Sequence, residues 1–127
     1  MSAQRLRTYL EHVREAAQQA CAYVEGFDEV EFRADKRTQQ AVMMNLIVLG
    51  EAATQLLKNH STFLARHPEV PWTSMKGMRN RMAHGYFEIN LTVVWETVRT
   101  ALPSLLSQLP PILEAAALDA PGDNEPR

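Results

Sequence analysis

Apolar residues recur at intervals of three and four along most of this 127-residue chain, and this spacing limits its fold more than any other feature. No segment has the strict alternation that is typical of a strand. In residues 3–25, Arg, Glu and Gln fill the positions between the apolar residues, which predicts one amphipathic helix with an apolar face of Leu6, Tyr9, Leu10, Val13, Ala17, Ala20 and Val24. The sequence therefore predicts an all-α fold.

A second long helix is expected over residues 35–59, and its middle, residues 41–49, is apolar almost all round. A surface helix would not tolerate this composition, so the helix should be central or should face another subunit. Further helices are expected at 61–66 after a serine cap, at 72–84 with Gly85 as a left-handed cap, and from residue 91 after the N-cap Asn90. Pro103 should kink or restart the last helix. Together these segments predict an up-and-down bundle of four or five helices.

Length and composition favour one folded domain over residues 1–118, because this size suffices to bury a core. Residues 119–127 are polar and rich in helix breakers, so a disordered tail is expected there. The single cysteine, Cys21, fits a reducing cytoplasm. Neither a signal peptide nor an apolar run of about 20 residues is evident, so a soluble cytoplasmic protein without a membrane partner is expected.

The segment 79–86, Arg-Asn-Arg-Met-Ala-His-Gly-Tyr, carries the candidate chemistry. Arg79 can hold a phosphate through its planar fork of donors, and the His84 imidazole can transfer a proton. A helix separates these two positions by about 140° and roughly 7–8 Å along its axis, whereas Asn80 shares a face with His84. Lys76 and Arg81 add positive charge for RNA binding, and no acidic residue occurs between residues 70 and 87. With a net charge of −2, RNA contact must come from such a local patch.

Metal-free RNA cleavage needs a base for the attacking 2′-hydroxyl, an acid for the leaving 5′-oxygen and positive charge on the phosphorane. The motif offers one histidine, because His12, His60 and His67 lie in other segments and are expected at the surface. A two-fold homodimer would bring two motifs to one phosphate. We predict His84 as base or acid, Arg79 as phosphate binder and Asn80 as positioner, with no cofactor and no metal site.

The string Arg79-Asn80-x-x-x-His84-x-Tyr86 resembles the R-x4-H-x-Y signature of HepT-like toxins in the HEPN superfamily of small helical proteins. The resemblance extends over about residues 5–113, with matching pieces at Gly50-Glu51-Ala52, Pro71-Trp72, Gly77-Met78 and Leu91–Val98. It implies a ribonuclease toxin of a type VII-like toxin–antitoxin system. It further implies a homodimer with the motifs at its cleft, and an MntA-type nucleotidyltransferase antitoxin that transfers AMP onto Tyr86.

Several alternatives stay open at the level of sequence. The chain could be a catalytically silent binding or dimerisation partner of a nucleotidyltransferase, or a plain helical bundle used for assembly. His84 could be a cation that caps a helix C-terminus, and Tyr86 could pack against an aromatic neighbour. Glu51 could orient Arg79 or form a structural ion pair elsewhere. The methionines at core-like positions need no cofactor to explain them: Met43, Met44, Met75, Met78 and Met82.

Overall fold

The computed structural model describes residues 3–118, and the tail expected at 119–127 lies outside this range. The described residues form helices and no strand, which confirms the all-α prediction. In chain order the elements are α1 (Ala3–Tyr23), α2 (Glu29–Ala34), α3 (Lys36–Asn59), α4 (Ser61–Ala65), α5 (Trp72–His84), η1 (Tyr86–Glu88), α6 (Leu91–Glu96), η2 (Thr97–Ala101) and α7 (Leu102–Leu118).

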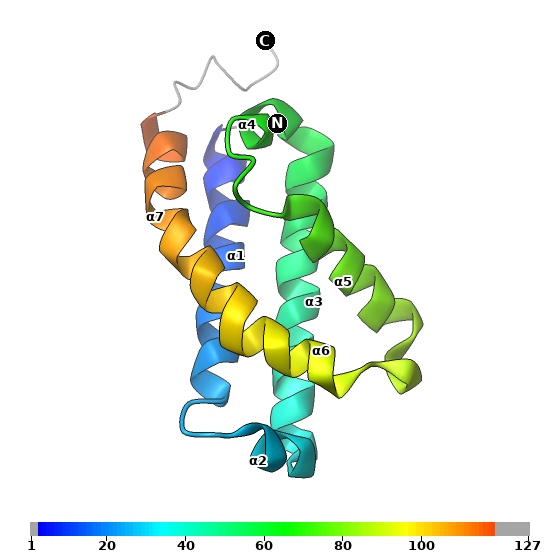
Figure 1. Ribbon diagram of the computed structural model, residues 1–127. Coiled ribbons are helices and arrows are strands. Elements are labelled where there is room, and N and C mark those ends of the chain that lie inside the picture. Colours follow the sequence, from blue (N-terminus) through cyan, green and yellow to red (C-terminus); the bar gives the residue numbers. More distant parts are fainter. Residues whose placement is uncertain (1–2, 119–127) are drawn as a thin grey trace.

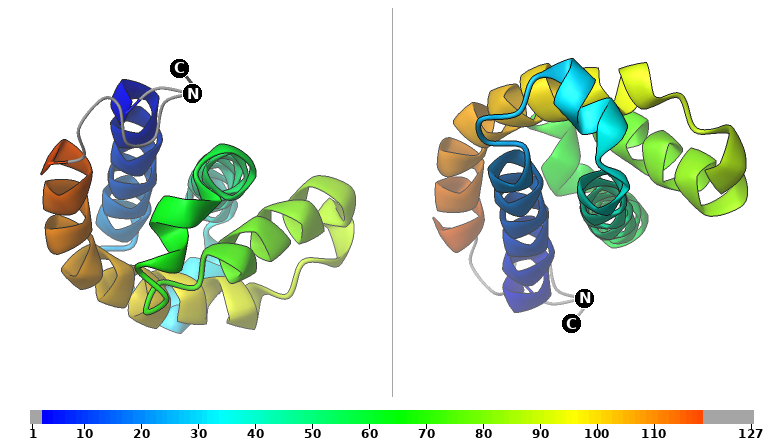
Figure 2. Two further views of the ribbon diagram at one scale, coloured as in Figure 1. Left: turned by 90° about the horizontal axis from the view of Figure 1, so that it is seen from above. Right: turned by 90° about the horizontal axis from the view of Figure 1, so that it is seen from below.

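Helices α1 and α3 run antiparallel along the centre of the molecule, and the other long segments flank them (Figure 1). Helix α5 packs on α3, whereas α6, η2 and α7 follow one another as a single curved arm that returns along α1. Seen along the bundle, α5 and the α6–α7 arm diverge from each other (Figure 2). The segment 79–86 therefore begins on a helix that is supported mainly by α3.

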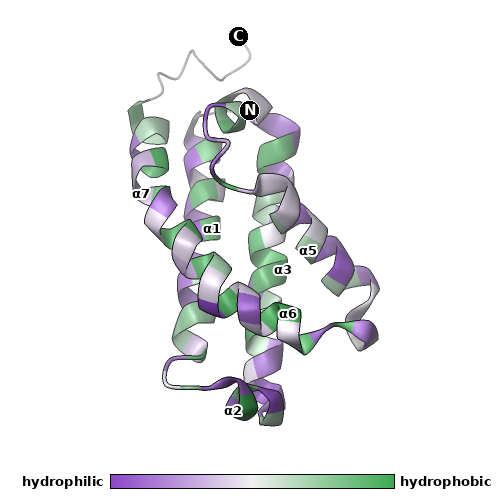
Figure 3. Cartoon of the chain, viewed as in Figure 1, coloured by the Kyte–Doolittle hydropathy of each residue, from purple (hydrophilic) through white to green (hydrophobic). Residues whose placement is uncertain are grey.

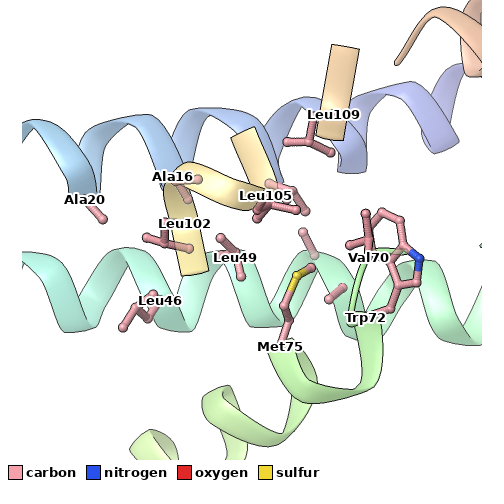
Figure 4. Packing of buried hydrophobic residues seen from close by; sticks show 14 of the residues in the cluster. Ala16, Ala20, Leu46, Leu49, Val70, Trp72, Met75, Leu102, Leu105 and Leu109 are labelled. Atoms are coloured by element: carbon pink, nitrogen blue, oxygen red, sulfur yellow. The ribbon is translucent and has the colours of Figure 1, made fainter. Parts of the chain in front are cut away.

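The core is a continuous cluster of mainly aliphatic side chains between α1, α3, α5 and α7, and it also includes the rings of Phe32, Phe63 and Trp72. In Figure 4, Leu46 and Leu49 of α3 lie beside Leu102 and Leu105 of α7, with Met75 of α5 next to them. Apolar and polar residues alternate around the visible faces of the long helices, as the periodicity predicted (Figure 3). Burial of this surface supplies the main favourable free energy of folding.

Helix α3 is central, as its apolar middle predicted, but it is not buried on every side. Met44 is 59% exposed and Val48 is 42% exposed, so the prediction of a core position for Met44 was wrong. Met44 and Val48 line a groove together with residues of α1, and no charged residue lies between Met44 and Glu51. Among the described helices, α3 is also the one long and apolar enough to satisfy a simple membrane-span criterion, which core helices of soluble proteins satisfy too.

Side-chain caps fix the starts of three helices, and at the first of these, α2, Asp28 accepts a hydrogen bond from the Glu31 N–H. Asp35 accepts a hydrogen bond from the Thr38 N–H at the start of α3, and Asn90 accepts hydrogen bonds from the first turn of α6, as predicted. The expected serine cap of α4 was wrong, because Ser61 is its first helical residue and His60 precedes it. Gly85 ends α5 as expected, but with a φ of −135° it is not a left-handed cap.

The last helix is continuous through Pro103 because its hydrogen-bond pattern changes just before that residue. Residues 97–101 form a π-helical turn, and α7 begins at Leu102. A wider turn accommodates a proline, whose ring excludes the normal hydrogen bond to the preceding turn. The expected restart is therefore a local π-bulge, and such bulges bend a helix. The bend lets α7 lie along α1 while α6 reaches toward the end of α5 (Figure 1).

His60 lies between α3 and α4 and is buried, so the prediction of a surface position was wrong. Only 4% of its surface is exposed, and among the described residues neither ring nitrogen has a hydrogen-bond partner. Burial lowers the pKa of His60, and the positive charge of Arg5 lowers it further. His12 is exposed as expected, whereas His67 is half-buried against the ring of Phe63.

The lowered pKa means that His60 takes up a proton at a higher pH in the unfolded chain than in the folded protein. We therefore expect the free energy of unfolding to decrease as the pH falls below about 6.5. One such group contributes a slope of at most about 1.4 kcal/mol per pH unit. Chemical denaturation at pH 7.5, 6.5 and 5.5 measures it. His60→Leu should flatten the slope, while His12→Gln, at an exposed site, should leave it unchanged. Equal slopes for wild type and His60→Leu would contradict the assignment.

Candidate active site

The position of α5 is set by an unusually close approach to α3 at Gly50. A Cβ atom built on Gly50 would lie 2.2 Å from the Cβ of Arg79 and 2.7 Å from the Met75 carbonyl oxygen. These distances are far below van der Waals contact, so only a residue without a side chain fits at this crossing. The close approach brings the Arg79 side chain directly over the next residue of α3, Glu51.

Arg79 is anchored by two neighbours. Its Nε and Nη2 atoms donate to Oε1 of Glu51 at 3.0 and 2.7 Å, and its Nη1 donates to Oδ1 of Asn80 at 2.7 Å. The Arg79 side chain is 29% exposed and that of Glu51 is 47% exposed. Of the two interpretations of Glu51, the structure supports the one in which it orients Arg79. Asn80 serves the arginine here rather than the imidazole.

The anchoring leaves the Arg79 guanidinium with capacity for a further ligand. A guanidinium carries five N–H donors, and Glu51 and Asn80 use three of them. The two remaining donors suit two oxygens of a phosphate. Residues 70–87 include no acidic residue in sequence, but acidic residues lie close to them in the fold. Glu51 lies beside Arg79, and Glu88 follows shortly after the motif. Glu51 fixes the arginine and lowers the net positive charge of the site.

His84 lies on a different side of α5 from the anchored arginine. Its exposed ring is part of the wall of a cleft of about 470 Å³ between α5, η1 and α6, and Arg79 does not line this cleft. Within residues 3–118 the His84 imidazole has no hydrogen bond or ion pair that would fix its orientation. A single chain therefore does not converge Arg79 and His84 on one point, in agreement with their five-residue spacing.

The remaining motif residues lie at the surface around the end of α5. Tyr86 begins the short helix η1, and 42% of its surface is exposed. Lys76 and Arg81 are exposed, and an Arg81 Nη atom lies 3.8 Å from the Met78 sulfur. Throughout residues 3–118, no three His, Cys, Asp or Glu side chains gather in an arrangement that could hold a metal ion.

A family model for HepT-like ribonucleases matches residues 13–112, a span that includes α3, α5 and the whole motif. This chain belongs to the HepT-like ribonuclease family. A probable ribonuclease HepT of Thermococcus cleftensis is 35% identical over 99 residues, which cover 78% of this chain and 87% of the relative. A candidate RNase of Caldanaerobacter subterraneus is 33% identical over 108 residues, 85% of this chain and 94% of the relative. No solved structure matches the HepT-like chain significantly.

The sequence alone missed the role of Gly50 in this HepT-like site. Gly50 belongs to the matching string Gly50-Glu51-Ala52, but a single sequence does not show whether another helix crosses at this glycine. The available signal was a glycine in the middle of an otherwise apolar helix, which costs helix stability and usually has a packing reason. Glu51 could be singled out because a charged residue in such a helix requires a partner.

Replacing Glu51 by glutamine is expected to lower RNA cleavage by on the order of 10²-fold, because Arg79 loses the carboxylate that fixes it. Stability should change by less than about 1 kcal/mol, since the pair is partly exposed to solvent. Cleavage rates and thermal melts separate the two effects. Glu11→Gln removes the Glu11–Arg14 ion pair on α1 and is the matched control, which should cut like wild type. Full activity of Glu51→Gln would show that Arg79 needs no anchor.

Proposed function

We propose that this HepT-like chain is the toxin of a type VII-like toxin–antitoxin system and acts as a metal-independent RNA endonuclease through Arg79 and His84. The observation that carries the proposal is the anchored Arg79, which Glu51 and Asn80 fix with two donors left over, five residues before an exposed histidine on the same helix. Family membership supports RNA as the substrate.

In the proposed reaction, a base removes the proton of a ribose 2′-hydroxyl, and the 2′-oxygen attacks the adjacent phosphorus. The bond between phosphorus and the 5′-oxygen breaks, and an acid donates a proton to that oxygen. The products are a 2′,3′-cyclic phosphate and a 5′-hydroxyl. His84 serves as base or acid, while Arg79 stabilises the negative charge of the phosphorane. Lys76 and Arg81 bind flanking phosphates.

A homodimer would supply the second imidazole that this reaction requires. The exposed apolar residues Met44 and Val48 of α3, with Tyr23 of α1, form a surface that a second copy could cover. Met44, Val48 and Glu51 follow one another at spacings of four and three, so this surface leads directly to the Arg79 anchor. Two copies joined here would place their motifs near one another.

Regulation by an MntA-type nucleotidyltransferase antitoxin fits the exposure of Tyr86. The phenolic oxygen would attack the α-phosphorus of ATP, lose its proton and release pyrophosphate, which leaves AMP on the tyrosine. The added anionic phosphate lies two residues from His84, where it would repel RNA and obstruct the cleft. This step needs no movement of the buried core, since Tyr86 is already 42% exposed.

The test is an assay of purified protein with total cellular RNA in EDTA, together with the molar mass in solution by light scattering. The proposal expects a dimer that leaves 2′,3′-cyclic phosphate and 5′-hydroxyl ends, and loss of cleavage after incubation with the antitoxin and ATP. Tyr86→Phe should cut RNA but resist this inactivation. Absence of cleavage by protein that carries no AMP would instead favour a catalytically silent partner of a nucleotidyltransferase.

A further inference from the structure

The cleft that His84 borders has a size and composition suited to a flat organic ring. Its volume is about 470 Å³, within the usual range of ligand pockets. Met82 of α5 and Val94 of α6 are buried at its wall, and Ile89 is half-buried there. In RNA, the flat ring nearest to a scissile phosphate is the base of an adjoining nucleotide. A ribose in contact with His84 would therefore direct its base toward this cleft.

Arg81 provides a surface for stacking at the same cleft. Its guanidinium rests on Met78, with a nitrogen 3.8 Å from the sulfur, and both residues line the cleft. Arginine planes stack on unpaired bases, and the methionine sulfur is polarizable and adapts to a flat surface. Apart from the His84 imidazole, the described wall residues include no aromatic ring, so Arg81 and the apolar side chains would hold the faces of the base.

Two polar side chains at the cleft can contact the edge of a base. Glu88 and Asn90 both line it, and the extended conformation of Ile89 between them directs them to the same side. The side-chain oxygen Oδ1 of Asn90 already accepts hydrogen bonds from the backbone N–H groups of Thr92 and Val93. Its NH₂ group is then the part available to a ligand, and it only donates, whereas an ionised Glu88 only accepts. The cleft thus offers one acceptor and one donor side by side.

We propose that this cleft is a nucleobase subsite, in which Glu88 and Asn90 contact the Watson–Crick edge of a base beside the scissile phosphate. The inference rests on the proposed ribonuclease function and adds the substrate class, which is single-stranded RNA with a base preference at the cut. Duplex RNA is excluded because its Watson–Crick edges are occupied by the opposite strand. Each base presents a different order of donors and acceptors at this edge, so a fixed donor–acceptor pair discriminates between them.

The experiment first locates the cut by sequencing the ends of cleaved RNA, and then varies the two flanking bases in single-stranded oligonucleotides. Wild type should prefer one base at one position by about 5- to 100-fold in kcat/KM. Glu88→Gln should reduce this preference to within twofold or change the preferred base. Glu96→Gln, an exposed residue of α6 outside the cleft, should keep the wild-type preference. A folding defect would lower all rates together without altering their ratio.

A blocking variant tests occupancy independently of base identity. In Val93→Trp, a larger side chain at an exposed position on the cleft wall should occupy the space of the base. This variant should cleave the preferred oligonucleotide at least tenfold more slowly than wild type, but it should cleave an abasic substrate at the wild-type rate. Base-independent cleavage by wild type, equal cutting of duplex RNA, or a preference unchanged in Glu88→Gln would overturn the subsite while leaving the ribonuclease intact. If wild type cuts neither the intact nor the abasic oligonucleotide, the proposed function itself fails.

Discussion

Replacement of His84 by alanine is expected to lower the rate of metal-free RNA cleavage by about 10²–10⁴-fold, the usual contribution of general acid–base catalysis. If the proposed dimer uses one copy of His84 as base and the other as acid, the variant loses both groups at once, and the upper end of this range applies. Because His84 is exposed and lies at the end of α5, its loss should leave the thermal melting curve unchanged. The measurement is the initial rate in EDTA with an end-labelled oligonucleotide.

His67→Ala is the matched control for this variant, because His67 lies in the loop after α4 and outside the site. It should retain wild-type activity in the same preparation. Equal cleavage by wild type and His84→Ala would identify the activity as a contaminant or assign the catalysis to other residues. Restoration of the rate of His84→Ala by added imidazole would identify the lost group as a proton-transfer catalyst.

Local sequence patterns sufficed to predict the long helices of this protein, but not the short helix α2. The long helices appear where apolar residues recur at three and four, and the bounds predicted for α5 are those observed. Asn90 was recognisable as a cap because its side chain acts on its own first turn. These features depend on interactions within a few residues, which a single sequence records directly.

The errors concern how helices meet. An apolar residue such as Met44 is expected in the core and a polar one such as His60 at the surface, yet Met44 is exposed and His60 is buried. Their burial depends on which faces of α3 the neighbouring helices cover. The spacing of Arg79 and His84 correctly indicated that one helix would not bring them together, but the cleft beside His84 depends on the path of α6. Pro103 predicted an irregularity in this helix, but not the π-helical turn that precedes it or the direction in which α6 runs.

The site is most sensitive at Gly50, a residue that takes no part in the chemistry. Gly50→Ala would place a methyl group 2.2 Å from the Arg79 Cβ and 2.7 Å from the Met75 carbonyl oxygen, so α3 and α5 would have to separate. Overpacking of this kind costs about 1–3 kcal/mol or more, and the gain in helix propensity, about 1 kcal/mol, does not offset contacts this short. We expect a lower free energy of unfolding and a loss of cleavage, because Arg79 moves away from Glu51.

Gly77→Ala separates the effect of packing from that of helix propensity. It is the same substitution in a helix, but the new methyl group meets only a side-chain nitrogen of Arg81, at 3.6 Å. Propensity alone then decides, so this variant should be as stable as wild type or more stable by up to about 1 kcal/mol. Urea denaturation of both variants gives the comparison. Equal stabilities for Gly50→Ala and Gly77→Ala would mean that the helices adjust without cost. The position of Arg79 would then depend on Glu51 and Asn80 rather than on the crossing at Gly50.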